Sequence, residues 1–220
     1  MRVAVVMSGK INRYKMEECL LSIKKHITKP FSTDVFCSFW DFESDLNQEI
    51  HNLINPTLIQ YVPYNDSIKQ YIQSISINCP TIIGPNTSSR TMTMYFQIFQ
   101  ANKMRELYQQ DNGFVYDVVI RVRPDIVVDS FEVTLPLKER SIYMSDKNTV
   151  YGVRDTLFVA NSATFSYTLY NFANFCQLMS KAISWHPELY FNLFLNANNI
   201  RIMPINNDHN TVSESFAYNI

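Results

Sequence analysis

Glycine is scarce in this chain, and the positive and negative charges of the chain nearly cancel. The scarcity of glycine argues against the common glycine-rich nucleotide-binding loops, and the balance of charge argues against binding of nucleic acid. The 220 residues include four glycines, and the first loop, Ser8-Gly9-Lys10, holds one of them. That loop is neither a Walker phosphate-binding loop nor the glycine-rich fingerprint of dinucleotide-binding folds. The formal net charge is -1, which gives no basic surface for the phosphates of a nucleic acid. We therefore expect any bound anion to be small.

Cysteines and long apolar segments are also few. The four cysteines show neither CxxC spacing nor a dense framework, and Cys19 and Cys37 fall inside apolar patterns. They are typical of reduced core residues. The apolar run near the amino terminus, residues 3–7, is too short for the core of a signal peptide or for a membrane span. We therefore expect a cytoplasmic protein with no transmembrane segment.

What the first half does contain is an alternation of strand and helix patterns. The expected elements are strands over residues 2–7, 34–40 and 58–62, helices over 16–27 and 43–54, and a long helix from about 90 to 110. Residues 64–88 have no clear period and are expected to form a loop with at most one short helix. This alternation predicts an α/β fold with a mostly parallel sheet flanked by helices. The length fits one such domain.

The second half is more mixed. We expect short strands at 141–144 and 157–160, helices at 163–179 and 187–197, and a last strand at 200–205. The tail over residues 206–220 is polar, and we find no strong pattern in it.

One stretch, residues 116–128, carries most of the functional information. Its β-branched residues 118–120 predict a strand covered on both faces, and Pro124, which cannot donate to a sheet ladder, predicts where pairing stops. Asp125 is then presented at the carboxyl end of a core strand, where open α/β sheets bind their ligands. A plainer alternative is that Arg121 and Arg123 line a solvent-facing edge and that Asp125 is a turn residue.

The order of these elements, together with this strand, resembles the nucleotide-sugar-dependent glycosyltransferases of the GT-A type. Their core strand ends in an Asp-any-Asp motif that holds a divalent metal on the donor's diphosphate, and Arg123-Pro124-Asp125 occupies that place here. The resemblance implies a GT-A-like (Rossmann-like) domain and Mn²⁺ or Mg²⁺ as cofactor. It also implies a nucleotide-sugar-binding half over 1–128 and an acceptor-binding half over 129–220. The metal ligand would be Asp125.

A narrower resemblance is to small surface-polysaccharide transferases of bacteria and of large algal viruses such as the chlorella viruses. The matching positions are Ser8, Gly9, Arg13, Trp40, Asp41, Arg121, Arg123 and Asp125. The chain would act in the host cytoplasm if it is viral. Arg123 departs from the acidic residue of the wider family, and an arginine can itself neutralise phosphate through two parallel hydrogen bonds.

The chemistry of the transfer assigns further candidates. Negative charge develops on the leaving diphosphate, so fixed positive charge or a carboxylate-held cation is needed there. We expect Ser8, Gly9, Arg13, Trp40, Arg90 and Arg123 to bind the donor. Three of these have plainer interpretations, since Arg13 can lie in a solvated loop, Arg90 can face water from a first helical turn, and Trp40 can be part of the core.

On the acceptor side, Asp155 and Glu188 are the candidate bases for the acceptor hydroxyl. Glu188 would equally suit the first turn of a helix, where the dipole favours a carboxylate. The resemblance adds His209 as a further metal ligand, although a solvated histidine explains it as well.

The leading hypothesis is a glycosyltransferase of glycan biosynthesis that moves a sugar from a nucleoside-diphosphate donor, a UDP-sugar first of all, to a glycan acceptor. One rival is a non-catalytic carbohydrate-binding or assembly module on the same fold, which the loss of the first carboxylate would suit. Another is a nucleotidyltransferase, which would need a second carboxylate close to Asp125.

Overall fold

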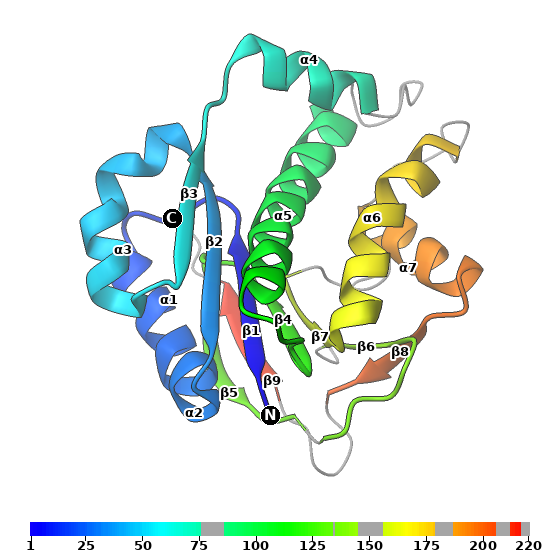
Figure 1. The fold of residues 1–220 in the computed structure, drawn as a ribbon. Helices are drawn as coiled ribbons and strands as arrows, with labels where there is room; N and C mark the ends of the chain where they lie inside the picture. The colour runs from blue at the N-terminus through cyan, green and yellow to red at the C-terminus, as the bar shows by residue number, and fades with distance from the viewer. Residues whose placement is uncertain (76–85, 134, 145–155, 179–186, 206–211, 217–220) are drawn as a thin grey trace.

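The seven strands of the main sheet stand in the order β3-β2-β1-β4-β7-β6-β8 within the part of the chain that the structure describes. That part of the computed structural model comprises residues 1–75, 86–133, 135–144, 156–178, 187–205 and 212–216 (Figure 1). The strands are β1 (Val3–Ser8), β2 (Asp34–Trp40), β3 (Leu58–Val62), β4 (Val118–Val122), β6 (Ser141–Met144), β7 (Leu157–Ala160) and β8 (Arg201–Pro204).

The sheet is parallel in the first half and mixed in the second. Strands β3, β2, β1 and β4 run in one direction, and β7 is antiparallel to both of its neighbours, β4 and β6. A separate ribbon pairs β5 (Ile126–Phe131) with β9 (Val212–Phe216) in antiparallel fashion. The mostly parallel α/β sheet is therefore confirmed. Strand β9 lies in the polar tail, where the sequence shows no strong pattern.

The helices follow the expected order with some different bounds. Helix α1 (Met16–Ile23) continues through a π-helical turn, η1 (Lys24–Thr28), into α2 (Lys29–Phe31), and the 3₁₀ turn η2 (Asp41–Leu46) precedes α3 (Asn47–Ile54). The others are α4 (Asp66–Ile75), α5 (Asn86–Asp111), α6 (Ser162–Leu178) and α7 (Pro187–Ala197). Helix α4 lies inside the segment that the sequence assigned mainly to a loop, and α5 begins at Asn86, earlier than expected.

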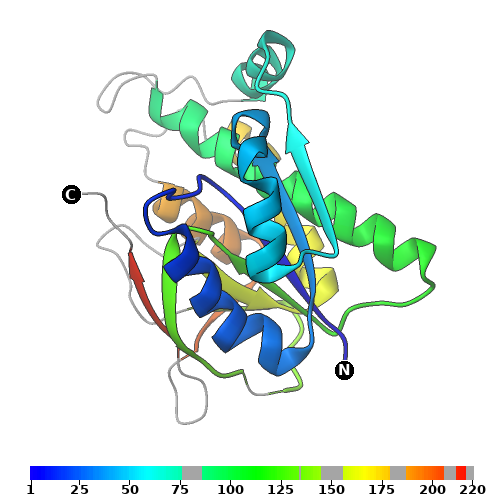
Figure 2. The same ribbon diagram turned by 90° about the vertical axis from the view of Figure 1, so that its left-hand side faces the viewer.

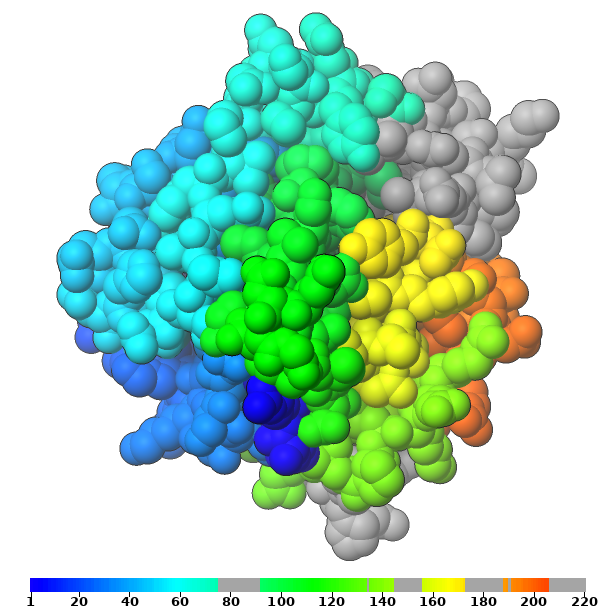
Figure 3. Space-filling view, viewed as in Figure 1, coloured from blue at the N-terminus to red at the C-terminus, as the bar shows by residue number. Residues whose placement is uncertain are grey.

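Two hydrophobic cores lie on the two faces of the sheet, because the side chains of each buried strand alternate between them. On β1, Ala4 and Val6 contact the core beneath α5, α6 and α7, whereas Val3, Val5 and Met7 contact the core beneath α1 and α3. The β5–β9 ribbon packs beside α1 on this second face (Figures 1 and 2). In the space-filling view, α5 and α6 lie side by side over the first face (Figure 3).

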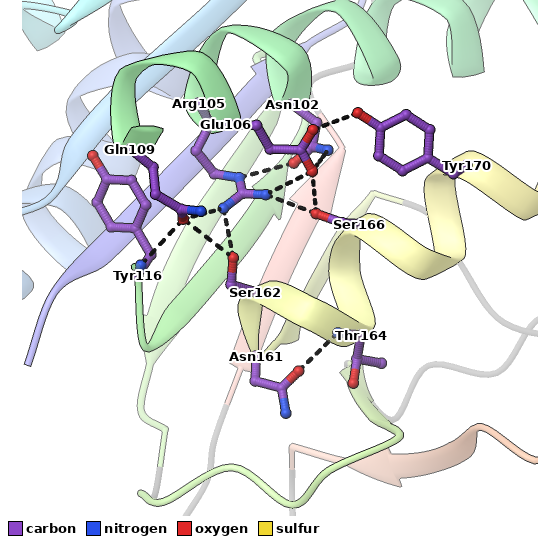
Figure 4. A network of polar contacts seen from close by, with 10 residues as sticks. All are labelled: Asn102, Arg105, Glu106, Gln109, Tyr116, Asn161, Ser162, Thr164, Ser166 and Tyr170. Carbon is purple, nitrogen blue, oxygen red and sulfur yellow. Dashed lines mark hydrogen bonds and ion pairs between the residues drawn. The ribbon is translucent and has the colours of Figure 1, made fainter. Parts of the chain in front are cut away.

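A closed polar network joins α5 to α6 around the fully buried guanidinium of Arg105 (Figure 4). Its Nη1 donates to Ser162 Oγ at 2.7 Å, and its Nη2 donates to Ser166 Oγ at 2.8 Å. Within α5, Arg105 also donates to Asn102, Gln109 and Glu106. The hydroxyls of Ser162, Ser166 and Tyr170 on α6 face α5, so the network fixes the two helices together.

Candidate functional site

The carboxyl ends of β1 and β4 lie next to each other, which brings two of the predicted loops together. Met7 is paired with Val122, so the residues that follow these strands meet at one edge of the sheet. Gly9 has a φ of 129°, where a side chain would be strained, and a Cβ there would lie 3.4 Å from Pro124 Cδ. The backbone of Gly9 therefore lies close to the Pro124 ring, which brings the first loop next to the Arg123-Pro124-Asp125 segment.

Arg123 and Asp125 form a two-fold hydrogen-bonded ion pair at this edge. Arg123 Nε donates to Oδ1 at 2.9 Å, and Nη2 donates to Oδ2 at 2.5 Å. The side chains are 29% and 20% exposed, so the pair is accessible from solvent. Bidentate geometry of this kind is also how a guanidinium binds phosphate. Strand β4 ends at Val122, just before Pro124, as the sequence predicted.

Arg121 and Ser8 are buried behind that pair. The Nη2 group of Arg121 donates to the backbone oxygen of Ser8 at 2.9 Å, and Nη1 donates to the backbone oxygen of Val122. Arg121 is fully buried in a central strand, so the alternative that it lines a solvent-facing edge is wrong. The hydroxyl of Ser8 is buried too, with no hydrogen-bond partner among the described residues. A nucleotide-sugar donor would reach the Ser8 hydroxyl only if this end of β1 moved.

Two contacts tie the first loop to the η2 turn after β2. The backbone N–H of Ile11 donates to Glu43 Oε1 at 2.9 Å, and Arg13 makes a bidentate pair with Asp45 at 2.7 and 2.9 Å. The Arg13–Asp45 pair is on the surface and raises the pKa of Arg13 through the hydrogen bond to Asp45. Glu43 is 3% exposed, and burial raises the pKa of its carboxyl. Arg13 is among the residues predicted from the sequence, whereas Glu43 is not, because its only signal is an acidic residue soon after a strand end.

Trp40 belongs to an aromatic group rather than to an open surface. It is 8% exposed, and its ring lies parallel to that of Phe96 with centroids 6.0 Å apart. On another side its centroid is 4.7 Å from that of Tyr64. The neighbouring Asp41 accepts a hydrogen bond from the Tyr64 backbone N–H at 3.2 Å. The structure thus agrees with the plainer interpretation of Trp40 as largely core.

The remaining predicted residues lie elsewhere or outside the described chain. Asp155 and His209 fall outside the described residues. Arg90 is in the first turns of α5, where its side chain is not described. Glu188 is half-buried in the first turn of α7, a helix that packs against α6 and β8. The structure therefore brings together Ser8, Gly9, Arg123 and Asp125, and it ties Arg13, on the first loop, to the η2 turn.

The side chains near Asp125 that could act as metal ligands limit which metal ion this edge can bind. Among the described residues there is no cluster of three or more His, Cys, Asp or Glu side chains that could bind a metal ion. Burial raises the pKa of Cys19 to about 11, and the charge of Asp125 adds to this effect, so the thiol stays protonated. Both oxygens of Asp125 already accept hydrogen bonds from Arg123. The described residues thus fit a divalent ion only where Asp125 is one ligand and substrate phosphates supply others.

No protein-family model matches the chain, and no curated protein matches it. In the part of the chain that the structure describes, no helix has the length and apolar character needed to cross a lipid bilayer.

Solved structures do resemble it. One is the apo form of the glycosyltransferase GlyE of Streptococcus pneumoniae TIGR4, with a TM-score of 0.49 and 12% identity over 92% of this chain. This chain spans about 45% of the length of GlyE. Another is the galactosyltransferase LgtC in complex with donor and acceptor sugar analogues. Its TM-score is 0.53 at 9% identity, over 91% of this chain and 72% of LgtC. At such low identity the likeness concerns the fold, and the chain has the mixed α/β fold of GT-A glycosyltransferases.

Proposed function

We propose that this protein is a glycosyltransferase that moves a sugar from a nucleoside-diphosphate donor to a glycan acceptor. The observation that carries the proposal is the accessible Arg123–Asp125 pair at the carboxyl end of β4, beside Gly9, in a GT-A-like fold. Ligands of open α/β sheets bind at this edge. A UDP-sugar is the donor to test first, and the narrower resemblance to bacterial and algal-virus enzymes stays a prediction.

In this proposal the donor's diphosphate lies across the ends of β1 and β4. The guanidinium of Arg123 exchanges one hydrogen-bonded partner, the carboxylate of Asp125, for another of the same geometry, the phosphate. Lys10, exposed on the first loop, adds positive charge close by. The positive charge stabilises the diphosphate as it leaves the sugar.

The proposed cofactor is Mn²⁺ or Mg²⁺, with Asp125 as the ligand from this chain. When bound, such an ion would add Lewis-acid stabilisation of the departing diphosphate. Asp125 becomes available to it when Arg123 turns to phosphate. His209 stays a proposed additional ligand.

On the acceptor side, a carboxylate takes the proton of the attacking hydroxyl while the bond from the sugar to the diphosphate breaks. Asp155 and Glu188 stay the proposed bases. Direct displacement of this kind inverts the configuration of the transferred sugar.

Calorimetry with UDP, GDP and TDP, each with and without Mn²⁺, tests the proposal. A transferase that uses a metal should bind at least one of the three nucleotides, and Mn²⁺ should strengthen that binding. Binding that is independent of Mn²⁺ would leave Arg123 as the main neutralising group. The absence of binding by all three nucleotides would contradict the proposal.

One observation favours a second function. The first acidic position of the family's metal motif is Arg123 here, and this arginine engages both oxygens of the remaining carboxylate. That arrangement suits a non-catalytic module that binds carbohydrate without using a donor. Such a module would bind oligosaccharide and show neither nucleotide binding nor hydrolysis of UDP-sugars.

A further inference from the structure

A groove with apolar and polar walls lies at the end of the sheet opposite to the proposed donor edge. Strand β7 is antiparallel to β4, with Val119 paired to Ala160 and Val122 paired to Leu157. Asn161, which follows β7, is therefore at the beginning of β4, whereas Arg123 is at its end. The length of β4, roughly 15 Å, separates the two regions. The groove is thus separate from the donor edge in the fold.

The groove begins as a hollow of about 370 Å³ between the start of α6 and the residues that precede β6 and β8. Its walls include Glu139, Arg140, Asn161, Thr164, Tyr167 and Ile200. This volume is within the range of roughly 300–1,000 Å³ that is usual for small-molecule sites. Figure 4 shows Asn161 and Thr164 on the side of α6 that is turned away from the Arg105 network.

Two flat side chains of this hollow are held in place by one residue, Asn198. The hydroxyl of Tyr167 donates to Asn198 Oδ1 at 2.7 Å, and Arg140 Nη2 donates to the backbone oxygen of Asn198, also at 2.7 Å. The guanidinium carbon of Arg140 is 6.0 Å from the centre of the Tyr167 ring. Tyr167 is nevertheless 41% exposed. The ring and the guanidinium are therefore fixed before any ligand arrives, which lowers the entropy lost on binding.

The chemistry of the walls selects an uncharged, hydroxyl-rich ligand. Glu139 and Arg140 give the first hollow one negative and one positive charge, so this hollow has no net charge to attract an anion, while Arg201 adds one positive charge to the second hollow along β8. Asn161 accepts a hydrogen bond from the backbone N–H of Thr164 at 2.8 Å and turns an amide nitrogen, with two donors, toward the same region. Carboxylate, guanidinium and amide groups together match hydroxyls, which both donate and accept. The partly negative face of the Tyr167 ring suits the C–H face of a sugar ring.

The hollow continues into a second one, which indicates a ligand longer than one sugar. The second hollow, of about 850 Å³, shares Glu139, Arg140 and Ile200 with the first. It runs along the edge strand β8 and includes Asn196 and Asn199. An extended chain can thus pass from the Tyr167 ring along β8.

We propose that this groove binds an uncharged segment of an oligosaccharide, at a distance from the edge where the donor would bind. The site does not depend on the proposed transferase activity, since it would hold a glycan equally well in a non-catalytic protein. In a transferase it would retain the growing chain between additions.

The test is an NMR titration of the ¹⁵N-labelled full chain with maltohexaose, cellohexaose and laminarihexaose, and separately with the polyanion hexagalacturonate. At least one neutral hexasaccharide should shift the amide signals of Thr164 and Arg140 and leave those of Gly9 and Asp125 unchanged. Shifts confined to Gly9 and Asp125, binding by the polyanion alone, or no binding by any neutral chain would overturn the proposal.

A matched pair of variants sharpens the test. Tyr167 and Tyr170 are both on α6, are 41% and 44% exposed, and each donates one hydrogen bond, but the wall of the hollow includes Tyr167 and not Tyr170. Tyr167→Ala should weaken oligosaccharide binding by about tenfold or more, as expected for loss of an aromatic contact. Tyr170→Ala should bind as the unmodified protein does. Equal loss in both variants would overturn the assignment, and UDP titration of the same samples reports on the donor edge independently.

Discussion

Arg105 and Arg123 each pair with a carboxylate, but the two pairs differ in burial and in where their partners come from. These differences distinguish an arginine that stabilises the fold from one that can bind a ligand. Arg105 is fully buried, and its partners come from two helices: Asn102, Glu106, Gln109, Ser162 and Ser166. Arg123 is partly exposed, and its side chain donates two hydrogen bonds to Asp125, two residues along the same loop. The first pair holds distant elements together, whereas the second joins two residues of one accessible loop.

That difference decides what each arginine can do. Burial lowers the pKa of Arg105, and the nearby Glu106 carboxylate partly offsets the effect, so the surrounding hydrogen bonds keep the charge in place. Exchange of a partner there would leave buried polar groups unsatisfied. At the β4 edge, water already reaches the pair, and a phosphate can replace the carboxylate without opening a core. A polar cluster that is fully satisfied from within is therefore the weaker candidate for a binding site.

The largest expected effect is on stability, from Arg105→Ala. This substitution removes the hydrogen bonds that Arg105 donates to both helices and leaves a cavity at a fully buried position, which should lower the free energy of unfolding by about 3–5 kcal/mol. Urea denaturation measures it. Arg13→Ala, which breaks a pair on the surface, is the control and should shift the midpoint very little. Equal effects from both substitutions would remove the distinction between the two kinds of pair.

Asp125→Asn should act on donor use and leave the fold intact. The amide loses the negative charge needed for a divalent ion, so metal-stimulated hydrolysis or transfer of the sugar should fall by about a hundredfold or more. Turnover of UDP-sugars with and without Mn²⁺ measures it. Asp117→Asn is a matched control at the other end of β4, where Asp117 accepts a hydrogen bond from the Arg2 backbone. Unchanged metal stimulation in Asp125→Asn would refute the metal ligand.

Arg123→Ala should weaken nucleotide binding by roughly 1.5–3 kcal/mol, the range for a hydrogen bond to a charged group. Calorimetry with UDP measures the change. Arg123→Lys keeps the charge and loses the planar fork, so it should recover only part of the affinity. If Arg123→Ala binds UDP as tightly as the unmodified protein, Arg123 serves only to hold Asp125.

Elements with a strong local pattern could be predicted from the sequence. The bounds of β2, β3 and α7 agree with the prediction, because alternating or helically spaced apolar residues and flanking prolines mark them. Strand β9 could not be predicted, since what forms it is pairing with β5, more than 80 positions earlier in the chain. The start of α3 was placed too early because η2 continues the same apolar spacing with a tighter turn.

The sequence predicted at which edge of the sheet the candidate site lies, but not which side chains contact each other there. Strand-end reasoning put Gly9 and Asp125 at one edge, and the register of β1 with β4 does bring them there. The pairing of Arg123 with Asp125 depends on the turn at Pro124, and the contact of Glu43 with Ile11 spans 32 positions. Neither contact leaves a signal in the spacing of apolar residues along the sequence.

The smallest expected effect concerns Glu43, which holds the loop that carries Gly9 and Arg13. Because burial raises its pKa in the folded protein, the folded state keeps a proton that the unfolded state loses above the ordinary glutamate pKa of about 4.3. The free energy of unfolding therefore falls as the pH rises from that value through the raised pKa, and the stabilising contribution is complete only below this window. Glu43→Gln keeps an oxygen for the Ile11 N–H and cannot ionise, so this part of the fall should vanish.

Urea denaturation of both proteins at intervals between about pH 4 and about pH 8 tests this, since other carboxyl groups titrate alike in both and cancel in the difference. The difference in unfolding free energy should shift in favour of Glu43→Gln as the pH rises. Glu49→Gln, at an exposed glutamate on the adjoining helix α3, is the control for the exchange of Glu for Gln itself. A pH-independent difference for Glu43→Gln would mean that Glu43 ionises as readily in the fold as in the unfolded chain. The carboxylate would then anchor the first loop as a fully charged group, which would bring a second negative charge toward the edge where Arg123 and Asp125 are proposed to meet the diphosphate.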